Sequence, residues 1–197
     1  MLMGSMRRGY VMIAAFLLTA WPMPPLSSEP APPLGTYQGS ATLPVRFEYP
    51  ADWKPLESSG STEIYTQVQL LAPLGGMSST FRTYMVVRAM PRQSQGGQYA
   101  NIQEAIAAYE SHAMPHLQIH QRAEIQRYDV TIHVMEISGD FQMPFERLPK
   151  APVFVKGQRM FFEKNDRLYE LGWLAVPDLA EQTAAAFAHL LDTLTFR

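Results

Sequence analysis

The C-terminal part of the chain constrains the fold most, because two strand-like segments there run directly into an amphipathic helix. Segments 156–162 and 167–176 are rich in aromatic and apolar residues, and Asn165-Asp166 between them tolerates the positive φ of a tight turn. The pattern predicts a β-hairpin in which Phe162 pairs with Tyr169. In that register one face of the hairpin collects Met160, Phe162, Tyr169, Leu171 and Trp173.

The closing segment predicts a helix that covers this face. Pro177 ends the preceding strand, and Asp178 with Glu181 has the spacing of a capping box. A mostly apolar stripe at helical spacing follows, made of Leu179, Thr183, Phe187, Leu190, Leu191 and Leu194. We expect Leu190 to face Trp173 across the layer. Nothing in this sheet-and-helix unit is arranged for chemistry.

Composition excludes several classes of protein. The chain has 197 residues, 47% hydrophobic and 17% charged, which suits a single globular domain. Sixteen Lys and Arg stand against eighteen Asp and Glu, so the formal charge of −2 offers no basic surface for nucleic acid. There is no cysteine, which excludes disulfides, thiolate metal sites, cysteine nucleophiles and a lipidated cysteine.

The N-terminus has the order of an export signal. Arg7-Arg8 precedes the apolar run 11–21, which is shorter than the roughly 20 residues of an ordinary membrane span. We interpret residues 1–21 as a signal peptide or an uncleaved N-terminal anchor, with a buried N-terminal helix as the alternative. Residues 22–39, rich in proline and serine, are interpreted as a tether, and residues 40–197 as one domain. The mature chain is therefore predicted to be exported, to the periplasm or another extracytoplasmic space.

The middle of the chain predicts strands and one further helix. Strands are expected at 45–49, 64–70 and 81–90, the last apolar on both faces like a central strand, with a polar loop at 57–61. Asn101 and Glu104 then have capping spacing for a helix that Pro115 ends.

A second hairpin is predicted from alternation in 117–125 and from the segment 130–137. Its turn is placed at Tyr128-Asp129, its apolar residues all lie on one face, and Glu124 lies opposite His133. The sum is an α+β fold with a mostly antiparallel sheet flanked by helices.

Three stretches of sequence carry a resemblance. The strand that ends in Phe47-Glu48-Tyr49-Pro50-Ala51-Asp52-Trp53, the hairpin strand with Arg167-Leu168-Tyr169-Glu170-Leu171, and the closing helix that runs into Leu191-Asp192-Thr193-Leu194-Thr195-Phe196 resemble the PsbP-like family of thylakoid-lumen proteins and their exported bacterial relatives. The resemblance covers roughly residues 40–197 and implies an α/β/α sandwich. It also implies an accessory or ligand-binding role without catalysis, the plant members assisting photosystem II. No functional residue is carried over, because the matching positions are strand and helix positions that hold the fold.

The sequence contains only weak signals for a metal site or a catalytic site. His116 and His120 lie four apart on a strand, a separation of about 13 Å, so they cannot easily share one metal ion, and His112 and His133 do not complete a ligand set. Ser78-Ser79 with His189 matches no known nucleophile signature. We therefore expect no catalytic residue, no metal and no cofactor.

The segment 141–152, FQMPFERLPKAP, is the best candidate for a contact surface. Its prolines prevent a regular ladder, yet its apolar side chains must pack on something. Met143, Phe145 and Leu148 are predicted to contact a protein partner; the alternative is that they shield a sheet edge.

Two functions remain open, with an enzyme as a distant third. The first is an exported accessory protein that binds another protein. The second is a carrier of an apolar small molecule held between sheet and helix, which a pocket of roughly 300 Å³ or more would favour. Nucleic acid is not expected as a partner, and a membrane only through an uncleaved N-terminal segment.

Overall fold

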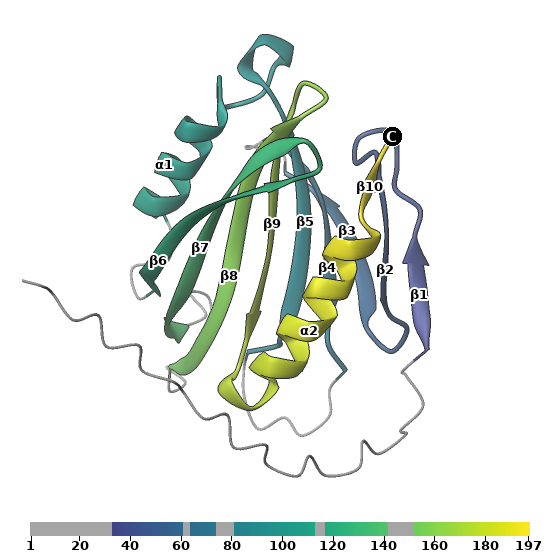
Figure 1. Cartoon of the computed structure of the whole chain (residues 1–197), viewed down its shortest axis with the longest axis vertical. Helices are drawn as coiled ribbons and strands as arrows, with labels where there is room; N and C mark the ends of the chain where they lie inside the picture. The colour runs from purple at the N-terminus through teal and green to yellow at the C-terminus, as the bar shows by residue number, and fades with distance from the viewer. Residues whose placement is uncertain (1–32, 61–63, 74–80, 113–116, 142–151) are drawn as a thin grey trace, which may run out of the picture. The chain divides into compact units, whose positions relative to one another are not determined.

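The computed structural model describes residues 33–60, 64–73, 81–112, 117–141 and 152–197. Within those residues the chain forms a seven-stranded sheet, a three-stranded sheet and two α-helices (Figure 1). The large sheet is antiparallel throughout and has the order β3-β4-β5-β9-β8-β7-β6. Its strands are β3 (Lys54–Ser59), β4 (Thr66–Leu71), β5 (Tyr84–Pro91), β6 (Leu117–Arg127), β7 (Val130–Phe141), β8 (Val153–Lys164) and β9 (Arg167–Ala175).

The remaining elements flank this sheet. The small sheet has the order β1-β2-β10, and the helices lie on opposite faces of the large one. A short 3-10 turn, η1, precedes the first helix. The bounds are β1 (Leu34–Tyr37), β2 (Val45–Pro50), η1 (Gln93–Gln95), α1 (Ile102–His112), α2 (Pro177–Thr193) and β10 (Thr195–Phe196). The α+β class and the α/β/α layering predicted from the sequence are both confirmed.

Both predicted hairpins form with the predicted turns. Asn165 and Asp166 have φ of 49° and 57°, and Tyr128 and Asp129 have φ of 55° and 60°, as two-residue primed turns require. The β8–β9 register pairs Phe162 with Tyr169, as expected from the sequence. The two rings stack with their centroids 5.3 Å apart. Local turn chemistry and alternation were therefore sufficient to fix this unit.

Each helix covers one face of the sheet. Helix α2 lies against β2, β5, β8 and β9, and its buried residues join the apolar cluster of Trp173 and Leu190. Helix α1 packs on β8 from the other side, where Tyr109 and Phe161 lie 5.3 Å apart between ring centroids. Strand β9 has apolar residues in both clusters, because it lies at the centre of the sheet.

The two predicted helix starts had different outcomes. In α1, Asn101 Oδ1 accepts the backbone N–H of Glu104 at 3.0 Å, and the Glu104 carboxylate accepts the N–H of Ala100 at 2.8 Å, one residue before the expected position. In α2 the predicted cap at Asp178 is wrong. The N-cap is Val176, with no side-chain hydrogen bond, and Pro177 is the first helical residue. Proline has the φ of a helix start already fixed, so the strand runs straight into the helix.

Two polar segments were assigned wrongly. Strand β1 lies inside the range interpreted as a tether and pairs with β2, Tyr37 opposite Phe47, so the folded unit extends to the N-terminal side of residue 40. Of the loop expected at 57–61, residues 57–59 belong to strand β3, all of whose residues are exposed. An edge strand open to water on both faces has no apolar alternation to reveal it.

Strand β6 also departs from the prediction. Its register shifts between Ile119 and Gln121, a β-bulge that leaves His120 as an extra residue. Before the bulge, Leu117 and Ile119 pack on the α1-side cluster; after it, Ile125 lies opposite Ile132 of the α2-side cluster. The single apolar face predicted for 117–125 is therefore wrong, because the extra residue exchanges the two faces halfway along the strand.

A groove between helix and sheet as the candidate functional site

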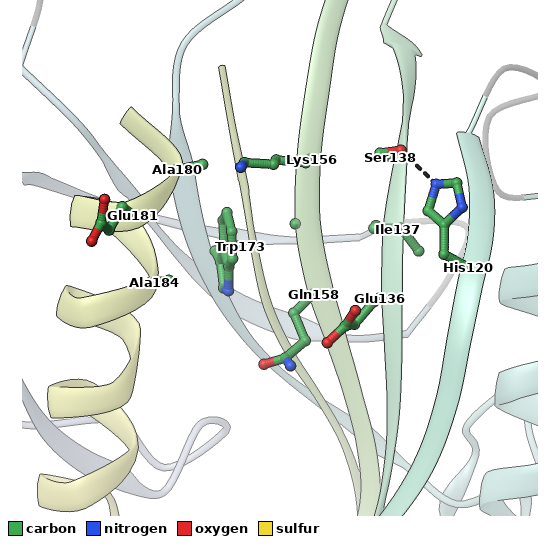
Figure 2. A pocket seen from close by; sticks show the side chains of 11 residues that line it. His120, Glu136, Ile137, Ser138, Lys156, Gln158, Trp173, Ala180, Glu181 and Ala184 are labelled. Atoms are coloured by element: carbon green, nitrogen blue, oxygen red, sulfur yellow. Dashed lines mark hydrogen bonds between the residues drawn. The ribbon is translucent and has the colours of Figure 1, made fainter. Parts of the chain in front are cut away.

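A groove of about 600 Å³ lies on the α2 side of the large sheet, between the first half of α2 and strands β8, β7 and β6 (Figure 2). It exists because α2 packs mainly on β9, β8 and β5, and among the described residues it leaves this part of β7 and β6 uncovered. Its lining consists of His120, Glu136, Ile137, Ser138, Lys156, Gly157, Gln158, Trp173, Ala180, Glu181 and Ala184. Six of these eleven residues have polar or charged side chains, the tryptophan not counted.

The helix side of the groove is small and apolar. Ala180 and Ala184 lie one turn apart on α2, and Trp173 of β9 lies between the helix and β8 (Figure 2). The indole is 9% exposed, so most of its surface packs in the core and a small part faces the groove. Alanine at both helix positions leaves room beside the indole that longer side chains would fill.

The sheet side carries charges of both signs. Lys156 of β8 lies opposite Ser138 of β7, and Gln158 lies opposite Glu136 in the same register. Lys156 extends towards Ala180 of α2 rather than along the sheet (Figure 2). Among the residues that the structure describes, the side chains of Lys156, Glu136 and Gln158 make no hydrogen bond or ion pair with one another or with other groups. These groups are available to a ligand.

His120 and Ser138 form the one polar pair inside the groove among the described residues. His120 Nε2 and Ser138 Oγ lie 2.5 Å apart, the contact drawn as a dashed line in Figure 2. The bulge places His120 on this face, beside Ser138. A serine–histidine pair can act as nucleophile and base when a third group orients the histidine. Within the described residues no carboxylate contacts His120, and the pair joins neighbouring strands β6 and β7 as a cross-strand hydrogen bond.

A second hollow, of about 550 Å³, lies on the opposite face between α1 and strands β6 and β7. Its polar groups are already engaged. His133 contacts Gln103 at 3.2 Å and Glu124 at 3.2 Å, and Arg122 donates to Glu110 at 3.1 Å. A ligand there would have to displace these contacts, which makes the α2-side groove the better candidate.

A buried ionic cluster lies on the α1 side of the sheet. Glu170 accepts from Arg88 at 2.8 Å and forms an ion pair with Arg159 Nε at 3.4 Å, and Arg159 donates to the Tyr84 hydroxyl at 2.8 Å. Gly172 is opposite Arg159, and a Cβ at Gly172 would lie 2.5 Å from the guanidinium. The glycine therefore makes room for the buried arginine.

The electrostatics of this cluster keep the arginine charged. Burial by itself would lower the pKa of Arg159, but the neighbouring Tyr84, Tyr109 and Glu170 raise it above its ordinary value overall. Burial also raises the pKa of Tyr109, which keeps that hydroxyl protonated. The charges of the cluster are turned towards one another, so the cluster holds the fold rather than a ligand.

The predicted contact residues Met143, Phe145 and Leu148 lie outside the described residues, and so do His116, Ser78 and Ser79. His120 and His133, whose side chains the structure describes, lie on opposite faces of the sheet. His120 lines the groove, and His133 contacts Glu124. Within the described residues no group of three metal-ligating side chains comes together. His189 contacts Glu48 at 3.1 Å, far along α2 from the groove residues.

No protein-family model and no curated protein matches the sequence. Among solved structures, cyanobacterial PsbP (CyanoP) from Synechocystis sp. PCC 6803 matches with a TM-score of 0.51 at 10% identity, over 83% of this chain and 92% of that one. The fold is PsbP-like.

Two bacterial structures match this chain less well. A Bacteroides thetaiotaomicron protein gives a TM-score of 0.47 at 11% identity over 82% of this chain, which spans about half (49%) of that protein. The Pseudomonas aeruginosa protein PA94, of unknown function, gives 0.48 at 14% identity over 83% of this chain and 97% of its own. The likeness to cyanobacterial PsbP, at 10% identity, shows the fold and no shared site.

The groove was not predicted from the sequence, although the sequence contains a signal for it. Along β7 and β8, Glu136, Ser138, Lys156 and Gln158 occupy positions that alternation assigns to the same face as buried Met160 and Val134. Polar residues on an otherwise apolar strand face indicate that the face is uncovered at that point. Where α2 crosses the sheet decides which part stays open, and the sequence does not specify that crossing.

Proposed function

We propose that this chain is an exported, non-catalytic accessory protein that binds another protein, and that the α2-side groove holds a segment of that partner. The observation that carries the proposal is the set of charged and polar groups of the groove that have no partner within the described residues. Such groups, next to an indole and two alanines, fit a polar polypeptide segment that presents both charges and a small apolar contact.

The carrier of an apolar small molecule is the alternative. The volume of about 600 Å³ is within the range of ligand pockets, above the roughly 300 Å³ that would favour a carrier. The lining argues against an apolar occupant, because burying Lys156 and Glu136 under hydrocarbon would strip their water without replacing it. The groove therefore favours a polar occupant, and the apolar segment with Met143, Phe145 and Leu148 stays a separate candidate contact.

We expect Lys156→Glu to lower the amount of captured protein partner roughly tenfold, the equivalent of about 1.4 kcal/mol. The reversed charge would repel the acidic group that Lys156 receives. The measurement is quantitative pull-down with the tagged full chain from the extracytoplasmic fraction. The matched control is Lys54→Glu, on exposed edge strand β3 away from the groove.

The same experiment separates the groove from the segment 141–152 as the binding surface. Phe145→Ser with Leu148→Ser should reduce capture if those residues contact the partner, and should lower the melting temperature if they shield a sheet edge. Full capture by a well-folded Lys156→Glu variant would contradict the groove as the binding surface. Full capture by a stable Phe145→Ser, Leu148→Ser double variant would remove the segment 141–152 from consideration.

Export is the second part of the proposal. The basic and apolar N-terminus supports it, and neither helix in the described part of the chain has the length and apolar content needed to cross a bilayer. We expect a C-terminally tagged full chain to appear outside the cytoplasm in fractionation. Recovery of intact, unprocessed chain in the soluble cytoplasm would contradict export and leave the groove proposal to its own test.

A further inference from the structure

Strand β6 ends the large sheet, with β7 as its strand neighbour. After the bulge at His120 it runs regularly from Gln121 to Arg127. Helix α1 packs on Phe161 of β8, two strands in from this edge. The opposite edge strand, β3, is shorter and contains Pro55, which lacks an N–H. Strand β6 contains no proline, so its outward backbone groups can pair with another strand.

The turn fixes which backbone groups of β6 point outward. In a hairpin with a two-residue turn, the residues that flank the turn, here Arg127 and Val130, form a hydrogen-bonded pair. Hydrogen-bonded pairs alternate along an antiparallel ladder. The N–H and C=O groups of Arg122, Glu124 and Gln126 therefore point away from β7, towards the open edge.

This edge is complementary to itself in one register. Two copies of β6 can run antiparallel with Ala123 opposite Ala123. Arg122 of each copy, whose backbone groups point outward, then lies opposite Glu124 of the other. Ala123 then forms the close, non-hydrogen-bonded pair on the two-fold axis, where a small side chain fits. Moving the axis by one residue in either direction places two arginines or two glutamates opposite each other, and like charges directly opposite are destabilising.

The side chains retain room for a second partner. Arg122 is 60% exposed beside Glu110, and Glu124 is 65% exposed beside His133, so both can contact a second copy without losing these neighbours. On the other face Ile125 is 39% exposed, and pairing would cover part of it. The charged residues and the partly exposed Ile125 therefore both favour a second copy of this chain as the partner at the β6 edge.

We propose that two copies of this chain associate through β6, with reciprocal Arg122–Glu124 pairs across a two-fold axis at Ala123. The axis is perpendicular to the sheet, so the two seven-stranded sheets join into one. The α2-side faces of both copies, with their grooves, then lie on the same side of the joined sheet. This inference is independent of what the groove binds.

The test uses charge reversal on the full chain, with molar mass measured by light scattering after gel filtration. Wild type should have twice the chain mass of 22.2 kDa. Arg122→Glu and Glu124→Arg should each be monomeric, because every pairing across the edge then joins like charges. The matched control, Arg46→Glu, alters an exposed arginine on β2 and should stay dimeric.

Mixing the two variants should restore a dimer with one copy of each. Both pairing positions are acidic in the Arg122→Glu chain and basic in the Glu124→Arg chain, so each contact between the two chains again joins opposite charges. Recovery of the dimer on mixing also shows that both variants are folded. A wild-type protein that stays monomeric up to high micromolar concentration would overturn the proposal. A dimer that persists in both single variants, or variants that stay monomeric when mixed, would overturn the Arg122–Glu124 pairing.

Discussion

Replacing Glu170 with glutamine should lower the free energy of unfolding by about 3–5 kcal/mol, the usual cost of removing one partner of a buried ion pair. Glu170 and Arg159 side chains are 7% and 5% exposed, so the variant leaves a guanidinium without a counter-charge inside the protein. Arg88 would lose its carboxylate as well, although it is 26% exposed and keeps Gln67. The measurement is urea denaturation, compared at equal slope.

The matched control is Glu136→Gln, an exposed carboxylate in the groove. It should change the free energy of unfolding by less than about 0.5 kcal/mol. Adding Arg159→Met to Glu170→Gln should recover part of the loss, because it removes the unpaired charge. Similar midpoints for Glu170→Gln and Glu136→Gln would show that the cluster contributes no such stability.

Replacing Leu190 with alanine should lower the free energy of unfolding by about 2–5 kcal/mol. The variant loses the transfer free energy of the removed atoms and also leaves a cavity under α2. Leu190 is fully buried at 0% exposure in the cluster that joins α2 to the sheet. The measurement is again denaturation, here against Leu56→Ala, the same substitution at a leucine 48% exposed on edge strand β3. Leu56→Ala should cost less than about 0.5 kcal/mol. Equal losses would mean that α2 does not bury the face assigned to it.

Leu190 and Trp173 were expected to face each other directly, and the structure places them in the same layer at different points along α2. Both belong to one apolar cluster, but Trp173 lies beside Ala180 and Ala184, in the first half of α2 (Figure 2). Helix periodicity identified the buried stripe correctly, since Thr183, Phe187, Leu190 and Leu191 are all buried. Periodicity gives the face of a helix and not its position along the sheet, which depends on the connection at Pro177.

The elements predicted correctly are those whose signal is local. The turn at Asn165-Asp166 and the cap at Asn101 depend on neighbouring residues alone, and both form. The elements missed depend on pairing with another strand rather than on a pattern of their own. Strand β1 exists because β2 pairs with it, and β3 because β4 does, while their own residues are too polar to indicate a strand.

The candidate site was harder to predict than the fold for the same reason. Lys156 and Glu136 come from neighbouring strands and face a groove whose other wall is α2. Their proximity follows from strand order and from the path of the helix, which no local pattern contains. Gly172 is a weak sequence signal for the buried Arg159. The glycine makes room for the guanidinium, but this need becomes apparent only when the register shows that the two residues lie opposite each other.

The bulge at His120 divides β6 into two half-strands, and odd-numbered residues lie on the α1 side before it and on the α2 side after it. A related chain without the extra residue would keep one parity throughout, so its second half would align with this one only across a one-residue gap. An ungapped alignment would match residues of one face with residues of the other for the rest of the strand and would hide real similarity.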